Sequence, residues 1–363
     1  MSQSLSSPLS QGAVIGILGG GQLGRMLSLA ASRLGFTCHI YGPEHHSPAT
    51  HVSALNITAP YDDLESVRDF AKRCDVVTYE FENVPELTAK AAASGSILRP
   101  GPQALSTAQD RLIEKTFLRD KAMVPVAPFA EIGNIPDLKR AIQTIGQPAV
   151  LKTRRFGYDG KGQYVIKTED EIETAWEAIG KQPAILEGFV PFKREVSIIA
   201  ARSARGDIAA YPLIENVHKN HILHTSTAPA TGSSETAQSF ARLILNELDY
   251  VGVIGVEFFE MENGDLIVNE IAPRVHNSGH WTQDAGCIDQ FELHIRAIAG
   301  WPLGDIQPKH AVQMTNLIGQ DINALDDFAR EPSTFIHSYG KNEARPGRKM
   351  GHINRILNGS VDS

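Results

Sequence analysis

The hydrophobic positions of the first hundred residues alternate between short apolar runs and a 3.6-residue period. The runs predict strands and the period predicts helices. In chain order, the expected elements are strands at 13–18, 37–41 and 76–79 and helices at 22–34, 64–73 and 85–94. Strands that alternate with helices favour a parallel sheet with right-handed crossovers. The pattern therefore predicts an N-terminal α/β domain over residues 13–120, with a final helix at 104–121.

The pattern changes after the prolines that follow this helix. A compact α+β unit is expected over 121–190, with helices near 136–145 and 169–179 and strands at 149–153, 164–167 and 184–186. From 191 to 363, apolar and polar residues alternate around turns, which predicts an antiparallel sheet with one long helix at 234–248. The fold class is thus α/β and α+β. The first twelve residues, MSQSLSSPLSQG, lack a basic and an apolar region, so they predict a disordered leader rather than a signal peptide.

Composition narrows the class of protein. The net charge of −8 argues against a broad nucleic-acid surface. Three scattered cysteines are too few for a disulfide framework or a zinc site and fit a reducing cytoplasm. No apolar run approaches the roughly 20 residues that span a bilayer. We therefore expect a cytoplasmic enzyme or binding protein without membrane or nucleic-acid partners.

A predicted hairpin opposes two glutamates. Two runs rich in β-branched and aromatic residues flank Asn263-Gly264, a strong signal for a two-residue loop. Counting back from that loop pairs Glu257 with Glu270. Opposed residues in a hairpin have Cβ atoms about 5 Å apart. Two carboxylates at a similar separation repel by roughly 3 kcal/mol at an effective dielectric near 20. A Mg²⁺ ion would relieve this repulsion, and a solvated acidic face is the alternative.

Two glycine-rich segments are candidates for binding phosphate. GGGQLG, with glycines at 19, 21 and 24, follows the first strand and opens a helix. It fits the dinucleotide-binding pattern, but the second strand ends in Ile40-Tyr41-Gly42 without the acidic residue that would hold a ribose. Another phosphate ligand is therefore favoured over NAD, and a tight turn without ligand is the third interpretation.

The second glycine-rich segment is LKTRRFGYDGKGQYVI, in which Lys152 lies on a strand. Its loop joins two strands, and its backbone N–H groups can approach phosphate oxygens closely. It is not a Walker A loop, because GK[ST] is absent and a strand follows. A plain hairpin tip is the alternative. The loop residues assigned to nucleotide binding are Gly157, Tyr158, Asp159, Gly160, Lys161, Gly162 and Gln163.

Together these features resemble the ATP-grasp superfamily, in which a nucleotide lies between a small lid domain and a larger antiparallel sheet. Within it, the chain resembles the 5-(carboxyamino)imidazole ribonucleotide synthase family of purine biosynthesis. GGGQLGRML, YEFENV, RRFGYDGKGQ, NEIAPRVHNSGHWTQ and ARPGRKMGH carry the resemblance from about residue 13 to 352. It implies an ATP-grasp fold with domains at 13–120, 121–190 and 191–363, the last bearing a basic arm. It also implies a homodimer.

The resemblance implies carboxylation of 5-aminoimidazole ribonucleotide by bicarbonate and ATP, through carboxyphosphate, with Mg²⁺ or Mn²⁺ on Glu257 and Glu270. Outside the loop, the implied nucleotide site comprises Arg111, Lys152, Glu187, Gly188, Phe189, Val190, Glu195, His218, Asn269 and Glu270. The implied site for the ribonucleotide comprises Gly21, Gln22, Leu23, Glu80, Asn83, Arg274, Asn277, Ser278, Arg345, Arg348 and Lys349. The implied catalytic residues are Tyr158, Asp159, Arg274, His276 and Lys349, with His276 the base candidate by pKa class.

Three other functions remain as hypotheses. The chain would be another ATP-grasp ligase, such as a formate-dependent glycinamide ribonucleotide transformylase, if its acceptor differs. It would be a nicotinamide-dependent oxidoreductase if GGGQLG bound NAD. It would be a non-catalytic nucleotide-binding protein if turnover were absent. One departure from the family is that the chain ends soon after GHINRI, whereas many relatives continue into another helix.

Overall fold

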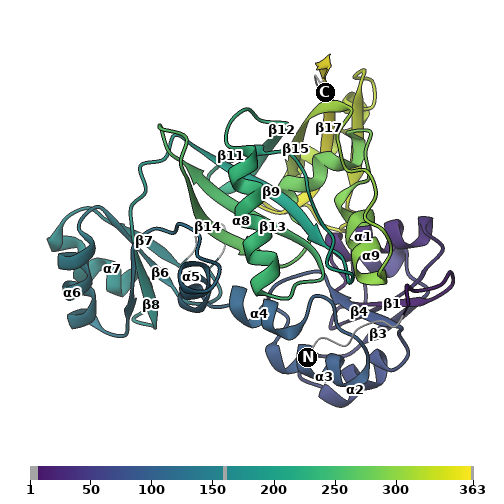
Figure 1. Ribbon diagram of the computed structural model, residues 1–363, viewed down its shortest axis with the longest axis horizontal. Coiled ribbons are helices and arrows are strands. Elements are labelled where there is room, and N and C mark those ends of the chain that lie inside the picture. Colours follow the sequence, from purple (N-terminus) through teal and green to yellow (C-terminus); the bar gives the residue numbers. More distant parts are fainter. Residues whose placement is uncertain (1–6, 158–161, 361–363) are drawn as a thin grey trace.

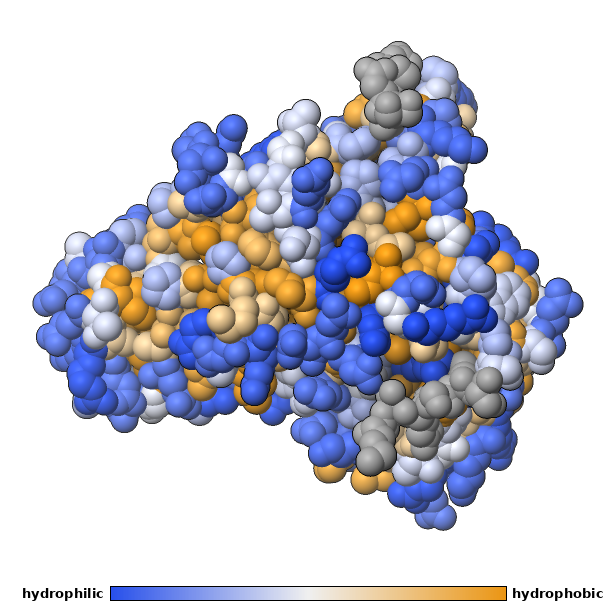
Figure 2. All heavy atoms as spheres, viewed as in Figure 1, coloured by the Kyte–Doolittle hydropathy of each residue, from blue (hydrophilic) through white to orange (hydrophobic). Residues whose placement is uncertain are grey.

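Three β-sheets organise the chain, as the sequence predicts. The computed structural model describes residues 7–157 and 162–360. A small lobe with its own sheet stands beside a large central sheet, and a parallel sheet lies on the other side of the molecule (Figure 1). On the face in Figure 2, hydrophilic residues dominate the rim and hydrophobic residues gather along the middle. Among the described helices, none has the length and apolar character needed to cross a membrane.

The N-terminal sheet is parallel and has the order β3-β2-β1-β4. Its elements are β1 (Val14–Leu18), α1 (Gln22–Arg33), β2 (Thr37–Gly42), the 3-10 helix η1 (Pro48–His51), β3 (Leu55–Thr58), α2 (Leu64–Ala71), β4 (Val76–Tyr79) and α3 (Glu86–Gly95). The expected strands and helices are all present. Strand β3 was not predicted, because its four residues are only partly buried and carry no clear apolar run.

The helix predicted at 104–121 is in fact two helices, α4 (Pro102–Ala108) and α5 (Arg111–Asp120). The break occurs at Asp110, whose side chain accepts hydrogen bonds from the N–H groups of Leu112 and Ile113 at 3.0 and 3.4 Å. An aspartate that caps new N–H groups starts a helix rather than continuing one. The hydrophobic period ran through this cap, so the prediction of a single helix was wrong.

The lid sheet is antiparallel, with the order β5-β8-β6-β7. Its elements are β5 (Phe129–Ile132), α6 (Ile135–Ile145), β6 (Ala149–Thr153), β7 (Gln163–Ile166), η2 (Glu169–Glu171), α7 (Ile172–Ala178) and β8 (Ala184–Gly188). Helices α6 and α7 pack on this sheet. Their apolar side chains, including Trp176 of α7, share a hydrophobic core with Leu151 of β6. The helix predicted at 169–179 is present, but its first turn is the 3-10 helix η2 and the α-helix α7 follows it.

The central sheet has the order β14-β13-β9-β11-β12-β15-β17-β16, and β10 pairs with β9. Its strands are β9 (Arg194–Arg202), β10 (Ile208–Ala210), β11 (Ile214–Lys219), β12 (Ile222–Ala228), β13 (Gly252–Glu260), β14 (Leu266–Ala272), β15 (His310–Ile318), β16 (Thr334–Ser338) and β17 (Lys349–Ser360). Its helices are α8 (Ser234–Glu247), η3 (Asn277–Asp284), α9 (Gln290–Ala299), η4 (Gly319–Ala324) and α10 (Leu325–Phe328). Helix α8 was predicted, whereas α9 was not.

The hairpin β13–β14 pairs Glu257 with Glu270, as predicted, but by a different route. Its loop has three residues, not two: Met261 pairs with Asp265, and only Gly264 has positive φ, at 87°. This loop shifts the pairing by one residue. A bulge at Asn269, which has no partner opposite it, then restores the predicted pair.

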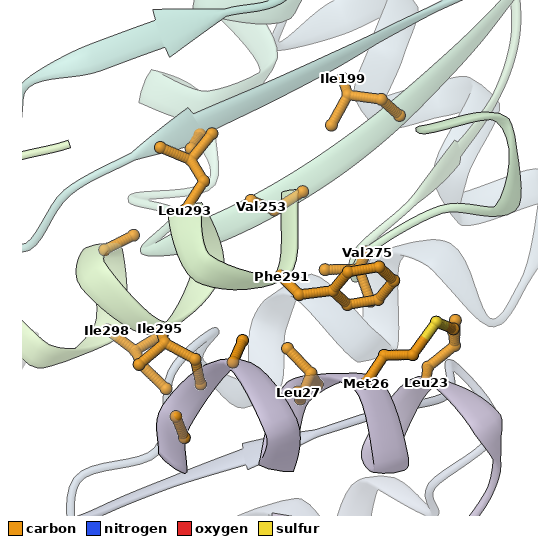
Figure 3. Packing of buried hydrophobic residues seen from close by; sticks show 14 of the residues in the cluster. Leu23, Met26, Leu27, Ile199, Val253, Val275, Phe291, Leu293, Ile295 and Ile298 are labelled. Carbon is orange, nitrogen blue, oxygen red and sulfur yellow. The ribbon is translucent and has the colours of Figure 1, made fainter. Parts of the chain in front are cut away.

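The parallel sheet and the central sheet share a core. Met26 and Leu27 of α1 face Phe291 and Ile295 of α9 (Figure 3). The N-terminal segment joins this contact, because the backbone of Leu9 donates to the Ala299 carbonyl at 2.9 Å. The Leu9 carbonyl accepts a hydrogen bond from Trp301 Nε1 at 2.8 Å. These two bonds hold Leu9, which lies within the segment predicted as a leader, against the C-terminal end of α9.

Candidate active site

A cleft of about 810 Å³ lies between the lid sheet and the central sheet. Its walls contain most of the residues predicted to bind nucleotide or metal. The predicted residues that line it are Arg111, Lys152, Gly157, Gln163, Glu187, Gly188, Phe189, Val190, Glu195, His218, Glu257, Asn269, Glu270, Arg274, His276, Asn277 and Lys349. Lining residues that the sequence did not single out are Glu82, Val150, Val165, Phe192, Asn216, Asn220, His221, Leu223 and Phe259. Tyr158, Asp159, Gly160 and Lys161 lie outside the described residues.

Glu257 and Glu270 meet on one wall of this cleft. Glu270 is exposed to solvent, yet desolvation by the surrounding protein raises its pKa, and repulsion from the Glu257 carboxylate raises it further. Burial also opposes ionisation of Glu257, but the contact of its Oε1 with His276 Nε2, at 3.0 Å, outweighs burial and lowers its pKa. The repulsion expected from the hairpin pairing is therefore present. Two such carboxylates form a place for a hard cation.

Two lysines converge on Glu187, near the C-terminal end of β8. Glu187 Oε2 lies 3.1 Å from Lys152 Nζ and 3.3 Å from Lys115 Nζ. Burial would raise the pKa of Glu187, but the two ammonium groups lower it to about 2. Lys115 also donates to the Asn269 carbonyl at 2.5 Å. Sequence reasoning missed Lys115, and its place on an otherwise amphipathic helix gave no signal.

Arg111 binds the backbone at the start of the glycine-rich loop. Its guanidinium donates to the carbonyls of Thr153 and Gly157 at 3.0 and 2.9 Å. Beyond the loop, Gly162 has φ of +70°, and a Cβ there would lie 2.7 Å from Thr153 Oγ1. A side chain at 162 would therefore disturb the loop. Gly162 itself does not line the cleft among the described residues.

A carboxylate–imidazole pair marks the far end of the cleft. His218 Nδ1 lies 2.7 Å from Glu195 Oε2. Burial lowers the pKa of His218, but the hydrogen bond and charge of Glu195 raise it above its usual value on balance. The pair lies on β11 and β9, which are neighbours in the central sheet. Near it, Phe192 and Phe259 stack with ring centroids 4.6 Å apart.

Arg274 joins the central sheet to the N-terminal domain. Its guanidinium forms an ion pair with Glu82, in the loop after β4. Burial would raise the pKa of Glu82, but Arg274 lowers it to about 2. The sequence pointed to Glu80 and Asn83 in this loop and passed over Glu82. Glu82 belongs to the same motif, YEFENV, but only the fold shows which of its carboxylates faces the cleft.

Glu80 occupies the anion position that the glycine-rich turn of α1 was expected to offer a phosphate. Its carboxylate accepts from the N–H groups of Gly21 and Gly24 at 2.5 and 2.9 Å. A Cβ on Gly19 would lie 2.4 Å from Glu80 Cγ, which explains the glycine. The interpretation of this turn as a phosphate cradle is therefore not supported. Burial raises the pKa of Glu80, and the two N–H groups partly offset that effect.

The remaining predicted residues surround this region without lining the cleft. Gln22 and Leu23 follow the turn on α1, Asn83 is exposed, and Ser278 is buried beneath His276. Asn277, in contrast, lines the cleft. Its Nδ2 donates to Asn316 Oδ1 at 3.0 Å, and Asn316 Nδ2 donates to Asn277 Oδ1 at 2.6 Å. The site is thus continued by an asparagine of β15.

The basic arm carries four cations, Lys341, Arg345, Arg348 and Lys349. Lys349 lines the cleft, whereas Arg345 is exposed and paired with Glu343. Arg348 donates to the Glu343 carbonyl at 2.9 Å. Lys341, which the sequence did not single out, donates to the Lys349 carbonyl at 2.6 Å. Burial, followed by the nearby Arg348, lowers the pKa of Lys341 to about 8.

Models of three protein families match successive parts of the chain. They are a ribonucleotide synthetase preATP-grasp domain over residues 13–109, an ATP-grasp domain over 117–291 and a phosphoribosylaminoimidazole carboxylase C-terminal domain over 312–361. The first match covers the parallel sheet, the second covers the lid sheet and strands β9 to β14 of the central sheet, and the third covers most of strands β15 to β17 of that central sheet. They confirm the ATP-grasp fold that the sequence motifs predicted.

Relatives match the chain over nearly its whole length. The N5-carboxyaminoimidazole ribonucleotide synthase of Brucella melitensis biotype 1 is 49% identical over 353 residues, covering 96% of this chain and 97% of the relative. That of Bacillus subtilis is 42% identical over 348 residues, covering 94% and 91%. These names agree with the family that the sequence motifs resemble.

Solved structures agree with the sequence matches. An N5-carboxyaminoimidazole ribonucleotide synthetase in complex with ADP has a TM-score of 0.93 and 41% identity, covering 98% of this chain and 95% of its own. The Aspergillus clavatus N5-carboxyaminoimidazole synthase, in complex with ADP and 5-aminoimidazole ribonucleotide, has a TM-score of 0.88 and 34% identity, covering 96% and 94%. The chain therefore belongs to the N5-carboxyaminoimidazole ribonucleotide synthase family.

Proposed function

We propose that this protein carboxylates 5-aminoimidazole ribonucleotide with bicarbonate and ATP, as a ligase of purine biosynthesis. ATP phosphorylates bicarbonate to carboxyphosphate, which releases carbon dioxide and phosphate beside the substrate amine. The amine then attacks carbon dioxide and forms the N-carboxy product. The observation that carries this proposal is that Glu257 and Glu270, which are paired in the hairpin, line the same cleft as the lysine-bound Glu187. The matching relatives give no support to the formate-dependent alternative.

ATP fits the chemistry of the cleft. Phosphoryl transfer depends on positioning and charge neutralisation, which Lys152, Arg111 and the loop at 157–163 would supply. Glu187 Oε1 is buried and has no hydrogen-bond partner within the described residues. An orphan acceptor of this kind suits the amino group of an adenine held against Gly188, Phe189 and Val190. Three polar groups, Glu195, His218 and Asn269, would bind the ribose and the phosphate side.

Mg²⁺, with Mn²⁺ as the alternative, would be held by Glu257 and Glu270. Within the ranges 7–157 and 162–360, no cluster of three or more metal-ligating side chains occurs. Mg²⁺ often binds through one or two carboxylates and completes its shell with water and substrate phosphates. The donor set therefore fits this ion. When bound, it would neutralise charge on the transferring phosphoryl group.

The acceptor and bicarbonate would lie where the cleft meets the N-terminal domain. Arg274, His276 and Lys349 line that part, and we assign bicarbonate and its phosphorylated form to them, together with Tyr158 and Asp159. The ribonucleotide would extend from there toward Glu80 and the basic arm. The residues assigned to it are Gly21, Gln22, Leu23, Glu80, Asn83, Arg274, Asn277, Ser278, Arg345, Arg348 and Lys349. Lys341 joins this set because it lies beside Lys349.

An omission assay tests this function. ADP release is measured with ATP, Mg²⁺, bicarbonate and 5-aminoimidazole ribonucleotide, each left out in turn. Full turnover should require all four. Undiminished ADP release with glycinamide ribonucleotide and formate in place of the acceptor and bicarbonate would contradict the proposal. We also expect a cytoplasmic homodimer, as in the sequence-based interpretation, and analytical ultracentrifugation checks the assembly.

A further inference from the structure

A line of buried polar side chains crosses the central sheet beneath His276. Ser226 on β12, Asn216 on β11 and Ser197 on β9 lie on three neighbouring strands, and Ser278 in η3 completes the line. The three serines are 0% exposed and Asn216 is 6% exposed. Polar groups buried in a sheet are costly unless each is hydrogen-bonded. Ser197 and Ser226 have no part in the function proposed above.

Short hydrogen bonds connect these residues to His276. Ser226 Oγ donates to Asn216 Oδ1 at 2.7 Å, and Asn216 Nδ2 donates to Ser197 Oγ at 2.8 Å. The hydroxyl oxygens of Ser197 and Ser278 are 2.8 Å apart. Ser278 Oγ lies 2.9 Å from His276 Nδ1. The chain of bonds is therefore continuous from β12 to the imidazole.

The amide of Asn216 gives the chain a direction. Its nitrogen only donates, so Ser197 Oγ accepts from it. Among the described residues Ser278 Oγ is the other hydrogen-bond partner of Ser197 Oγ, so the Ser197 hydroxyl proton is directed to Ser278 Oγ. Ser278 Oγ then donates to His276 Nδ1. The backbone N–H of Ser278 also points to Nδ1, at 3.4 Å. Nδ1 is thus an acceptor, so in the neutral imidazole the proton is on Nε2.

The other side of the ring requires the same tautomer. Nε2 lies 3.0 Å from Glu257 Oε1, and an ionised carboxylate only accepts. If the hydrogen bonds from Ser226 to His276 ran in the opposite direction, Nδ1 would carry the proton. The Nε2 lone pair would then face the Glu257 carboxylate, and the two would repel. The two ends of the network therefore agree on one arrangement.

The fold also fixes the position of His276. Gln290, which is fully buried, accepts from the His276 backbone N–H at 2.9 Å and donates to its carbonyl at 2.8 Å. Gly255 leaves room for the ring, because a Cβ there would lie 2.7 Å from His276 Cβ. The imidazole is consequently held in place as well as in tautomer.

We propose that Ser226, Asn216, Ser197 and Ser278 make His276 a fixed hydrogen-bond donor at Nε2, which stabilises negative charge on bicarbonate and its phosphorylated form. This inference rests on the proposed function. It changes the expectation that His276 is a general base, because the lone pair that a base needs is on Nδ1 and is engaged by Ser278. Ser197, Asn216 and Ser226 are positioning residues. Because the ring is held in place, this donor needs little reorganisation during the reaction beyond leaving Glu257.

Nitrogen NMR of the histidine side chains tests the tautomer directly. The ¹⁵N-histidine-labelled protein is examined at pH 8 without nucleotide or divalent metal, and the His276→Gln variant identifies the His276 signals. The expected result is one neutral form with the proton on Nε2. An Nδ1–H form, or an even mixture of both forms, would overturn the proposal. This readout needs no turnover, so it stands apart from a failure of the proposed function.

Serine substitutions test the role of the chain. In Ser197→Ala, the direction imposed by Asn216 is lost, so we expect kcat for ADP release to fall by about 10-fold to 100-fold. The KM for ATP should stay within about twofold, because ground-state nucleotide binding is untouched. Ser197→Thr keeps the hydroxyl and should restore most of kcat.

Ser203→Ala is the matched control. Ser203 is also buried, but within the described part of the chain its side chain hydrogen-bonds only inside the turn after β9, to Asp207 and to nearby backbone. Its kcat should match that of the wild type. Unchanged kcat in Ser197→Ala, or an equal loss in Ser203→Ala, would reduce the chain to a structural role and refute the inference.

Discussion

Two carboxylates and a lysine pair set the electrostatics of the cleft at the level of single residues. Glu270 has a raised pKa because the surrounding protein limits its hydration and the Glu257 carboxylate repels its charge, whereas Glu187 stays ionised between Lys115 and Lys152. A protein that keeps two like charges together without a counter-charge gives up stability. A cation supplied with the nucleotide relieves that cost, which is the reason to assign the metal to Glu257 and Glu270.

Glu270→Gln tests this assignment. The amide keeps the shape of the side chain but removes the charge that would bind the cation, so kcat for ADP release should fall by about 10² to 10³. Nucleotide binding without metal should persist, because the adenine and ribose contacts are unchanged. Titration calorimetry and the ADP-release assay measure the two quantities.

Glu262→Gln, at the exposed tip of the same hairpin, is the control for this variant and should retain wild-type turnover. Full activity of Glu270→Gln would exclude Glu270 as a metal ligand. Loss of ATP binding together with turnover would instead indicate a damaged fold.

Helix α5 is the element that places several of these groups. Arg111, Glu114 and Lys115 lie in its first two turns and reach the loop carbonyls, the Ile271 N–H and Glu187, respectively. The cap at Asp110 begins this helix and also binds Arg154 at 2.9 Å, from the strand end that leads into the glycine-rich loop. One aspartate therefore fixes both the helix and the lid strand.

Asp110→Ala should destabilise the protein by roughly 1–3 kcal/mol, the sum of a lost N-cap and a partly buried ion pair. The free energy of unfolding in urea measures this change. Asp120→Ala, at the exposed C-terminal end of the same helix, should change stability by less than about 0.5 kcal/mol. An equal effect of the two substitutions would contradict the role of the cap.

At the scale of the whole molecule, α9 joins the N-terminal domain to the central sheet. Its His294 Nδ1 accepts from the Val253 N–H at 3.1 Å, so Nε2 carries the proton and donates to Thr78 Oγ1 at 2.9 Å. Val253 belongs to β13 and Thr78 to β4. A neutral, buried imidazole thus connects two sheets, and burial lowers its pKa to about 3.

This connection predicts acid sensitivity. The unfolded chain takes up a proton at His294 near pH 6.5, whereas the folded protein resists it until about pH 3. The stability due to the neutral group is therefore complete above pH 6.5 and declines as the pH falls toward 3. At pH 4.5 the loss should be roughly 3 kcal/mol, from two pH units at about 1.4 kcal/mol each.

His294→Gln provides the comparison, because an amide can make both hydrogen bonds without titrating. The free energy of unfolding is measured from pH 7.5 to 4.5 for both proteins. The variant should lose less stability on acidification than the wild type. Parallel curves would show that His294 does not titrate between the two states as described.

The sequence by itself determined the local features: the parallel βαβ pattern, the hairpin that opposes Glu257 and Glu270, the glycine-rich segments and the motifs of the family. These depend on residues close together in the chain, where periodicity and turn chemistry decide the structure. Even there, the three-residue loop and the bulge at Asn269 escaped the pattern, and the correct pair resulted only because the two shifts cancel.

Only the tertiary structure decided which distant side chains meet. The contacts of Glu187 with Lys115, of Arg274 with Glu82 and of Ser197 with Ser278 join elements that are separated by tens to hundreds of residues. The alternation of a strand says which face a side chain occupies, but sheet order decides its neighbours on that face. His276 shows the consequence, since its residue type suggested a base and its neighbours make it a donor.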